Sequence, residues 1–541
     1  MSMRRAMYLL VVFLLTVSML FGCSNAGTES EVGNVTTSET KAAEAESYFS
    51  ETEYPIVKEP ITLTTVTSDN KPLEEMKMFQ ELSAKTNINI STEAIGGDGY
   101  AEKKALILAS GDLPDMFFGE GLTNEDIATN VDYFVDMAPL IEKYAPNIQF
   151  MFNQDPWTKK LARMAGTNSI YGLTGVRPFR PVSMDTWYIN KVWLENVGMD
   201  IPKTLDEFEQ VLLAFKEKDA NGNGDPNDEV PLVCNGPNAQ HQSWRNILGS
   251  FGGTNPTYAV AQQVRDGKVQ FIYAIDSTKE AIKYMHKLYS QGLVYEDLMT
   301  ALYGAGITEL NTTEKCRIGV YVNWADTGLY NDQYVAFPVM EGPTGIREAT
   351  TAFPGGIRGK QNLFSITTAN KYPEATMRWI NEVYSEEMTV QTFFGAFGEG
   401  IEKTDTGYKT IDPPEGMAAD VFKWELAPAD GGPVYFYKQL EDKIKAHESY
   451  YNKLKDDAVN DPYRQPVEYA FPMVTFTSDV ADEIARLNND IHSFAGTKVA
   501  QWVTKGGIDE EWTAYLDQLN DMGLEKYLEL YQAAYDVYMK D

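Results

Sequence analysis

The amino-acid sequence predicts an α/β fold that is built on a mainly parallel sheet. Short runs of β-branched and apolar residues alternate with longer segments whose apolar residues recur at helical spacing. Turn-forming Gly, Pro, Asn and Asp separate the two kinds of segment. This alternation is typical of sheets with helices packed on their faces, and a chain of 541 residues is long enough for more than one domain.

Each element follows from a local pattern. Residues 61–66 (ITLTTV) are β-rich and predict a strand, and Met76, Phe79 and Leu82 recur at helical spacing in the next segment. The sequence TLDE at 204–207 predicts a capping box at the start of a helix. The expected elements are strands at 61–66, 88–90, 116–118, 186–189, 230–233, 318–323 and 361–368, and helices at 73–86, 103–109, 191–197, 205–218, from 373 onward and through roughly the last sixty residues.

The N-terminus has the pattern of a lipoprotein signal peptide. Arg4 and Arg5 precede an apolar stretch at 8–20 that is short for a membrane span. Cys23 follows Leu-Phe-Gly, which resembles a bacterial lipobox, so we expect residues 1–22 to be removed and Cys23 to be lipidated. The alternative is an ordinary signal peptide with a cysteine by chance. Residues 23–56 are rich in Ser, Thr, Gly, Ala and Glu, which predicts a flexible linker.

The composition excludes some partners. The formal net charge of −32 repels phosphate backbones and anionic headgroups, so we expect no nucleic acid partner and membrane contact only through the lipid. The charge serves either solvation or the steering of a ligand. Cys234 and Cys316 could form one disulfide or stay as buried thiols, and the lack of a spacing signature favours thiols.

Catalytic motifs are absent from the sequence. The four histidines have no metal-ligand spacing, and there is no nucleophile elbow, Walker loop or dinucleotide fingerprint. Carboxylates are too many for one glycosidase pair to be singled out. We therefore expect no catalytic residue.

The strongest chemical motif is the loop at 219–229, with the sequence DANGNGDPNDE. Alternating side-chain oxygens and a backbone carbonyl supply the hard ligands that calcium prefers, as in an EF-hand, whereas magnesium favours a strict octahedron with water. Val230 stands where an EF-hand has its closing Glu, and the alternative is a polar turn. The expected ligands of a structural calcium ion are Asp219, Asn221, Asn223, Asp225, Asp228 and Glu229.

Candidate ligand contacts come from strand ends and aromatic residues. Ser68 and Asp69 follow the first strand, and ligands of α/β sheets bind at the carboxyl ends of strands. Trp187, Trp244 and Trp324 lie in loops or at strand ends, where broad, rigid rings could stack on sugar. The alternatives are turn and cap roles for the first two residues and core packing for the rings.

With these motifs, the chain resembles the family 1 extracellular solute-binding lipoproteins of ABC sugar importers, and among them the binders of alginate and pectin oligosaccharides. The calcium loop is similar to that of the alginate binders but longer by about one residue, which leaves the roles of Asp225 and Asn227 open. The match at 398–400 adds Glu399 to the candidate ligand contacts. The matching stretches are 108–115 (LASGDLPD), 188–231 with PKTLDE at 202–207, 370–375 (NKYPEA), 398–400 (GEG) and 523–535.

The resemblance implies a two-lobed, periplasmic-binding-protein-like fold with a hinge and a ligand cleft between the lobes. We expect one lobe to comprise 57–180 and 336–400, and the other 181–335 and 401–541. Closure of the cleft would bury the ligand and form the state that docks on the importer.

The predicted function is therefore capture of a carbohydrate outside the membrane by a monomeric, lipid-anchored protein, which delivers it to ABC permease subunits. The alternatives are a calcium-containing polysaccharide-degrading enzyme and a peptide-binding or sensor protein of the same fold. The acidic composition disfavours an anionic ligand unless arginines line the cleft. The candidates are Arg177, Arg180, Arg245 and Arg358.

Overall fold

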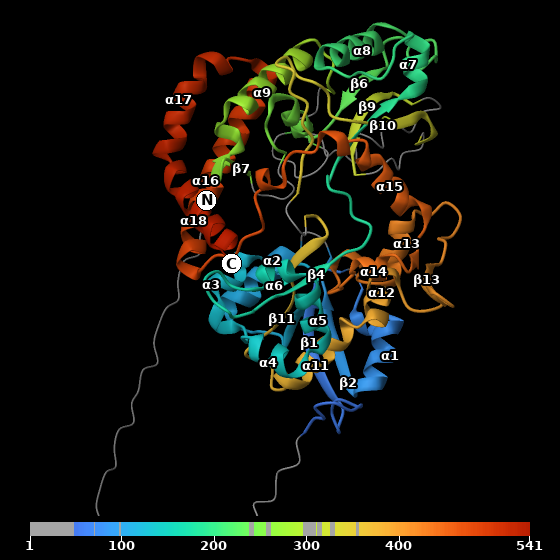
Figure 1. Cartoon of the computed structure of the whole chain (residues 1–541), viewed down its shortest axis with the longest axis vertical. Coiled ribbons are helices and arrows are strands. Elements are labelled where there is room, and N and C mark those ends of the chain that lie inside the picture. The colour runs from blue at the N-terminus through green and yellow to red at the C-terminus, as the bar shows by residue number, and fades with distance from the viewer. Residues whose placement is uncertain are drawn as a thin grey trace, which may run out of the picture. The chain divides into compact units, whose positions relative to one another are not determined.

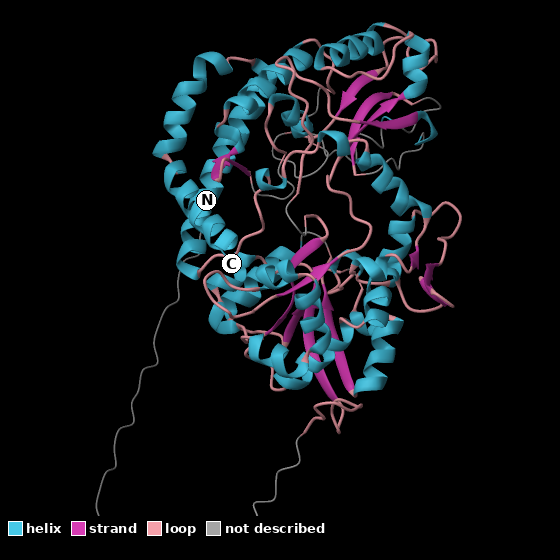
Figure 2. Cartoon of the chain, in the orientation of Figure 1, coloured by secondary structure: helices cyan, strands magenta, loops and turns pink. Residues whose placement is uncertain are grey.

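The structure, a computed structural model, describes residues 48–69, 71–96, 99–236, 243–255, 261–295, 310, 316–324, 331–352 and 356–540 (Figure 1). Cys23 and the predicted signal peptide lie outside these residues. Helices and strands alternate through most of the described chain, and the strands collect in separate sheets (Figure 2). The expected α/β class is confirmed.

The first sheet has the strand order β2-β1-β3-β11-β4. Its strands are β1 (Ile61–Thr67), β2 (Ile88–Ala94), β3 (Met116–Phe118), β4 (Leu173–Val176) and β11 (Gly359–Ile366). β1 runs parallel to β2 and β3, whereas β11 is antiparallel to β3 and β4. The carboxyl ends of β1, β3 and β4 therefore meet at one edge, together with the start of β11.

Helices surround this sheet and bury its core. Phe79 packs edge-on against Phe118, with 5.5 Å between ring centroids, and both rings contact Trp379. As expected, Pro373 opens its helix. The helices of this region are α1 (Lys77–Thr86), α2 (Gly99–Ser110), α3 (Asn124–Thr129), α4 (Ala138–Tyr144), α5 (Pro146–Gln154), α6 (Pro156–Ala162), α11 (Pro373–Val383) and α12 (Glu386–Phe394).

The second sheet has the order β10-β5-β9-β6. Its strands are β5 (Thr186–Asn190), β6 (Val230–Val233), β9 (Ile318–Asn323) and β10 (Tyr334–Phe337). β5 is antiparallel to β9 and β10, and β6 is parallel to β9. The sheets are thus mixed, and the expectation of a mainly parallel sheet is wrong, because β11 in the first sheet and β5 in the second run antiparallel to both of their neighbours.

Helices from two distant parts of the chain share the core of the second sheet. The predicted capping box is present: Thr204 accepts from the Glu207 amide, and the Glu207 carboxylate accepts from the Thr204 amide. The C-terminal helices bury Ile491 and Trp502 in the same cluster as Phe208. The elements are α7 (Lys191–Val197), α8 (Leu205–Glu217), α9 (Asp276–Ser290), the hairpin β7 (Gln262–Arg265) and β8 (Lys268–Phe271), and α16 (Ser478–Lys505), α17 (Ile508–Asp521) and α18 (Leu524–Lys540).

A third, smaller sheet lies between these regions in sequence. Its core joins Phe393 of α12 to Ile401, Phe436 and Tyr450. The predicted lobe boundaries stay a prediction. The elements are β12 (Ile401–Thr404), β13 (Gly407–Thr410), β14 (Ile444–Lys445), α13 (Ala419–Leu426), α14 (Lys438–Glu441) and α15 (Glu448–Ala458). Short 3₁₀ helices connect the elements of the chain: η1 (Leu73–Glu75), η2 (Val131–Tyr133), η3 (Trp244–Phe251), η4 (Ile272–Ala274), η5 (Asn331–Gln333), η6 (Ala429–Gly431), η7 (Asp461–Tyr463) and η8 (Val467–Tyr469).

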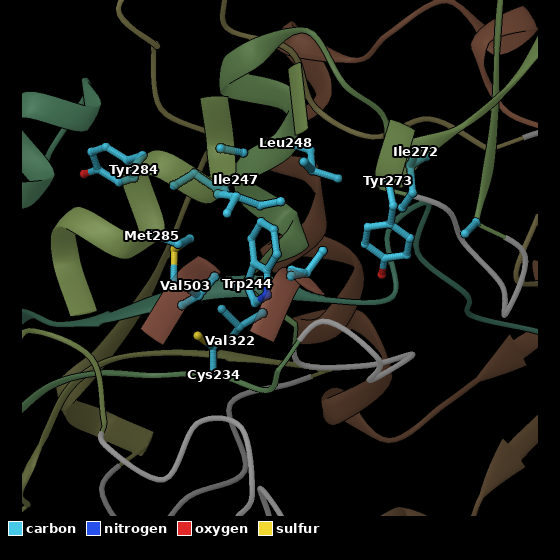
Figure 3. Packing of buried hydrophobic residues seen from close by; sticks show 14 of the residues in the cluster. Cys234, Trp244, Ile247, Leu248, Ile272, Tyr273, Tyr284, Met285, Val322 and Val503 are labelled. Carbon is cyan, nitrogen blue, oxygen red and sulfur yellow. The ribbon is translucent and has the colours of Figure 1, made fainter. Parts of the chain in front are cut away.

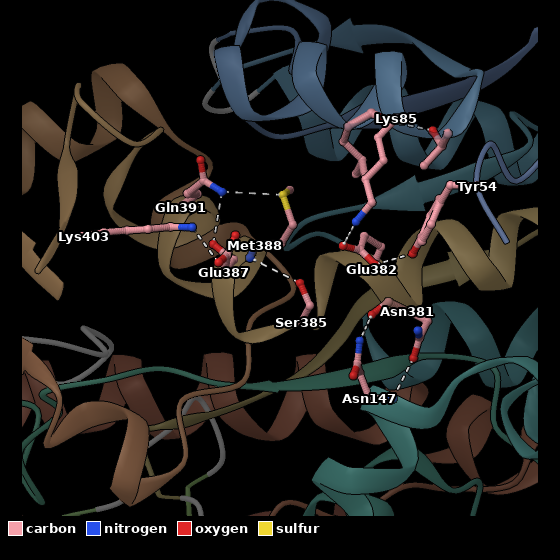
Figure 4. Close-up of polar contacts among 12 residues, drawn as sticks. Tyr54, Lys85, Asn147, Asn381, Glu382, Ser385, Glu387, Met388, Gln391 and Lys403 are labelled. Carbon is pink, nitrogen blue, oxygen red and sulfur yellow. Dashed lines mark hydrogen bonds and ion pairs between the residues drawn. The ribbon is translucent and has the colours of Figure 1, made fainter. Parts of the chain in front are cut away.

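The folded part begins earlier than residue 57. Phe49 and Ile56 are 8% and 0% exposed and belong to the core of the first sheet. Tyr54 donates to Glu382, which also pairs with Lys85 (Figure 4). Residues 48–56, which we expected in the linker, therefore pack onto the fold because their aromatic and aliphatic side chains find a core.

Two further expectations concern thiols and membranes. Cys234 and Cys316 are free and buried, so the thiol interpretation is confirmed. Burial raises the pKa of the Cys234 thiol, as expected for an inert structural cysteine. Within the described ranges, no helix combines the length and apolar character that a membrane crossing requires.

Candidate functional site

A cavity of about 380 Å³ lies where the edges of the first two sheets contribute residues to one wall. Its size is within the range typical of small-molecule sites. The lining combines aromatic, cationic and anionic side chains. It consists of Arg177, Arg180, Met184, Trp324, Ile357, Asp420, Trp424 and Asp430.

Strand ends explain why these residues meet. Arg177 directly follows β4, and Ile357 comes shortly before β11, so both belong to the carboxyl edge of the first sheet. Trp324 directly follows β9, whose last residue Asn323 pairs with Thr186 at the start of β5. The cavity is thus built at sheet edges, where α/β folds place ligands.

Helix α13 supplies the outer part of the wall. Asp420 and Trp424 are four residues apart, so they lie on one face of the helix. Trp424 is 54% exposed, which is unusual for a ring of that size. An exposed ring beside charged groups is a surface on which a sugar can stack.

An ion-pair network runs through the cavity wall. The guanidinium of Arg180 pairs with Asp430, and Lys423 lies 3.4 Å from Asp430 and 3.0 Å from Asp420. Burial opposes ionisation of Asp430, but Arg180, Lys423 and Arg177 hold its pKa well below the usual range. Asp430 is therefore fully ionised and charge-compensated at neutral pH.

A second carboxylate, that of Glu120, compensates the charge of Arg177. Glu120, just after β3, lies 3.7 Å from Arg177 and 2.6 Å from Lys360. Burial lowers the pKa of Lys360, which Arg177 lowers further and Glu120 opposes. Opposite charges thus face each other in pairs at the carboxyl edge of the first sheet.

Two cations lie close to the ring of Trp324. The Lys453 Nζ is 4.6 Å and the Arg180 Cζ 5.3 Å from the ring centroid, both within cation–π range. Burial lowers the pKa of Lys453 to about 8, and the charge of Asp457 opposes this shift. These contacts hold the Trp324 ring in place at the cavity.

Ser68 and Asp69 lie beside the cavity wall. Ser68 Oγ donates to the Glu120 carbonyl at 2.8 Å, and Thr67 Oγ1 donates to Asp69 at 3.1 Å. Burial raises the pKa of Asp69 to about 6, with a further contribution from Glu120. The structure therefore brings both predicted residues close to the site without placing them in its lining.

Three predicted contacts lie elsewhere. Trp187 is 3% exposed and packs on Phe208 and Phe337, and Trp244 is 0% exposed in the core of the second sheet (Figure 3). Neither ring has a face for a sugar, so core packing replaces the predicted role. Glu399 is exposed in the turn before β12 and does not line the cavity.

Of the predicted rings, Trp324 lines the cavity, and sequence reasoning missed Trp424. Polar residues flank Trp244 in the sequence, and Lys423 and Glu425 flank Trp424 in the same way, so sequence neighbours do not distinguish the two rings. Of the four candidate arginines, Arg177 and Arg180 line the cavity. The side chain of Arg245 is buried outside the cavity lining, and Arg358, also outside the lining, pairs with Glu441.

The loop at 219–229 closes on itself with its oxygens held by its own amides. Asp219 accepts from the Asn223 and Gly224 amides, both at 2.9 Å, and Asn223 Oδ1 accepts from the Asp225 amide at 2.7 Å. The Gly224 φ of +92° permits the turn. The side-chain amides of Asn221 and Asn223 donate to the two carboxylate oxygens of Asp228, at 3.0 and 2.9 Å.

The loop fits an oxygen-coordinated cation. Glu229 Oε2 is buried and has no hydrogen-bond partner among the residues that the structure describes. One cation, Arg317, pairs with the loop, at 3.4 Å from Asp228. In the described parts of the chain, no three His, Cys, Asp or Glu side chains are grouped as a metal site, so Asn and backbone oxygens would have to complete the ligand set.

Sequence comparison shows relatives over most of the chain. Residues 67–390 match the model of the bacterial extracellular solute-binding protein family. The fructooligosaccharide ABC transporter substrate-binding protein FusA of Streptococcus pneumoniae serotype 4 is 29% identical over 509 residues, which are 88% of this chain and 90% of FusA. The polygalacturonan/rhamnogalacturonan-binding protein YtcQ of Bacillus subtilis is 24% identical over 225 residues, 41% of this chain and 42% of YtcQ.

Solved structures share the fold. An HMO-binding, ABC-transporter-associated solute-binding protein of Bifidobacterium longum infantis superposes with a TM-score of 0.80 at 26% identity, over 89% of this chain and 99% of its own. FusA of S. pneumoniae in complex with kestose gives a TM-score of 0.78 at 28% identity, over 89% of this chain and all of the FusA chain. Another FusA structure is of an EF-hand mutant with fructo-nystose.

Proposed function

Because the chain belongs to the bacterial extracellular solute-binding protein family, we propose that it binds an oligosaccharide and delivers it to an ABC importer. Members of this family bind solutes, so the chain is a binding protein and not an enzyme. Two relatives that span most of the chain, FusA and the HMO-binding protein, carry names of oligosaccharide binders.

The observation that carries the proposal is the cavity with Trp324 and Trp424 beside the Arg180–Asp430 pair. Indole rings supply broad apolar faces for sugar C–H groups, and the ion pair offers donors and acceptors to hydroxyls. Trp324 is held by Lys453 and Arg180, so it needs little ordering when a ligand arrives.

Calorimetric titration of the mature chain from residue 24 with kestose, nystose, lacto-N-tetraose and short maltodextrins tests this proposal. We expect at least one probe to bind and to be recovered intact. Replacing Trp424 by Ala should weaken that binding about tenfold, because a stacked ring contributes on the order of 1 kcal/mol.

Phe150 provides the matched control. It is 46% exposed, it is aromatic, and it lies outside the cavity lining. Phe150→Ala should bind the same probe as the unchanged protein does. Equal affinity of Trp424→Ala and the unchanged protein would place the sugar elsewhere, and binding of peptides with no sugar bound would replace the proposed cargo.

We also propose a structural calcium ion in the loop at 219–229. Asp219, Asn221, Asn223 and Asp228 would hold it by side-chain oxygens, Asp225 by its carbonyl, and Glu229 by its buried oxygen. Calcium would neutralise carboxylates that Arg317 compensates only in part. An EF-hand in FusA supports this proposal.

Finally, we propose that Cys23 is lipidated and that residues from 24 to about 47 tether the protein at the outer face of the cell membrane, as a monomer. The lipobox and the Ser-, Thr- and Glu-rich segment support this. Mass spectrometry of the N-terminal peptide is the test, and a free Cys23 thiol in membrane-extracted protein would contradict it.

A further inference from the structure

The charges that line the cavity cancel. Its two cations are Arg177 and Arg180, and its two anions are Asp420 and Asp430. The cavity wall therefore carries no net charge, although the whole chain carries −32. Such a wall offers charged groups for hydrogen bonding without a field that attracts or repels one sign.

Each cation near the cavity already faces a carboxylate. Arg180 and Lys423 hold Asp430, and Lys423 also holds Asp420. Arg177 and Lys360 share Glu120. A ligand carboxylate would have to replace a carboxylate that already compensates one of these cations, so it would gain no net charge pairing for the cost of its own desolvation.

Lys453 is the remaining cation close to the wall. Its Nζ lies over Trp324, and the charges that act on it are those of Asp457, Asp185, Asp456 and Arg180. This ammonium group is buried, since Lys453 is 3% exposed, and it has no hydrogen-bond partner among the described residues. Lys453 does not line the cavity, so it is not presented to the carboxylate of an acidic sugar.

Hydrogen-bonding capacity does remain. The Nε of Arg180 is buried and donates to no acceptor within the described part of the chain. A sugar hydroxyl or ring oxygen could accept this bond and leave the Arg180–Asp430 pair in place. Neutral acceptors and apolar ring faces are what the cavity can still satisfy.

We propose, on the basis of the proposed function, that the cavity selects uncharged oligosaccharides and rejects those that carry carboxylates. The selection comes from the carboxylates of the wall, which already pair with its cations and leave none of them to compensate a ligand carboxylate. The chemical class of the cargo is thus a neutral oligosaccharide, in contrast to uronate- or sialate-bearing glycans.

Titration of the mature chain with matched neutral and acidic probes tests this selection. The neutral probes are nystose and lacto-N-tetraose, the acidic ones trigalacturonate and 6′-sialyllactose, and the best neutral binder is also tested after oxidation of a primary hydroxyl to a carboxylate. We expect the neutral binder to exceed its oxidised form in affinity by at least about tenfold. The difference should shrink as salt rises, because screening weakens the repulsion between an acidic probe and the net charge of −32 on the whole chain.

Two variants separate charge from shape. Asp420→Asn removes one wall carboxylate that pairs with Lys423 three residues later, and it should narrow the neutral-to-acidic ratio about threefold. The control Glu483→Gln breaks the equivalent pair with Arg486 outside the cavity and should leave the ratio unchanged. Circular dichroism and the melting temperature confirm that both variants are folded.

Each outcome bears on the selection. An acidic probe that binds as tightly as the neutral ones would overturn it, as would an unchanged ratio in Asp420→Asn. If no sugar of either class binds, the proposed function itself fails, which is distinct from sugar binding with the wrong charge preference.

Discussion

The cavity wall and the loop at 219–229 are both rich in carboxylates, but their charges are balanced differently. In the wall, Asp430 and Asp420 each lie within 3.5 Å of a cation, and Glu120 beside the wall pairs with Lys360. In the loop, Asp219, Asp225, Asp228 and Glu229 share one arginine among the described residues. The wall therefore suits a neutral ligand, whereas the loop suits a cation from solution.

The difference shows that a cluster of acids has no single meaning. What decides its chemistry is the number of cations that the fold brings to it and how deeply both are buried. This difference between the wall and the loop can be tested by removing a countercharge from the wall or by supplying one to the loop.

The largest expected effect is on stability, from the wall. Arg180→Ala should lower the free energy of unfolding by about 3 kcal/mol, because it removes a buried guanidinium that packs on Trp324 and leaves Asp430 with only Lys423 and Arg177 to compensate its charge. Urea denaturation measures the change. Arg486→Ala, which breaks an exposed pair, should change stability by less than about 0.5 kcal/mol. Equal effects of both variants would show that burial does not distinguish the pairs.

The next effect concerns the loop. Calcium at a hundred times its dissociation constant should stabilise the mature chain by about 2.7 kcal/mol, seen as a higher melting temperature that EDTA reverses. Asp219→Ala should abolish the shift, since it removes the first ligand of the loop. Magnesium at the same concentration is the control. No response to calcium in the unchanged protein would leave the loop as a polar turn.

A smaller effect concerns Asp69, a carboxylate beside the cavity wall that forms no ion pair among the described residues. Its pKa is raised to about 6, so the folded state binds the proton more tightly than the unfolded state does. Stability should fall as pH rises from about 4 to about 6, and Asp69→Asn should be more stable than the unchanged protein by about 1 kcal/mol at pH 7. Thermal melting at pH 4 and pH 7 checks this. A stability difference between Asp69→Asn and the unchanged protein that is the same at both pH values would contradict this prediction.

Local patterns made much of the fold predictable. The strand at Ile61–Thr67, the capping box at Thr204 and Glu207, and the Pro373 helix start lie where the sequence placed them, because neighbouring residues determine them. The mixed direction of the sheets was not predictable. It depends on where β5 and β11 insert between strands of the opposite direction, which is determined by packing between distant parts of the chain.

The two candidate sites differ in the same way. The loop is contiguous, so its spacing alone suggested a cation. The cavity joins residues as distant as Arg177, Trp324 and Trp424, and no local pattern distinguishes Trp424 from Trp244. Both rings have polar neighbours in sequence, and only the tertiary structure buries one and exposes the other.

The central claim is that a neutral oligosaccharide occupies the cavity between Trp324 and Trp424. A crystal structure of the mature chain with the tightest-binding neutral probe tests it most directly. The account predicts a sugar ring against Trp424, a hydroxyl or ring oxygen on Arg180 Nε, and an intact Arg180–Asp430 pair. A sugar bound outside this lining, or a broken pair with Arg180 turned to a ligand carboxylate, would contradict it.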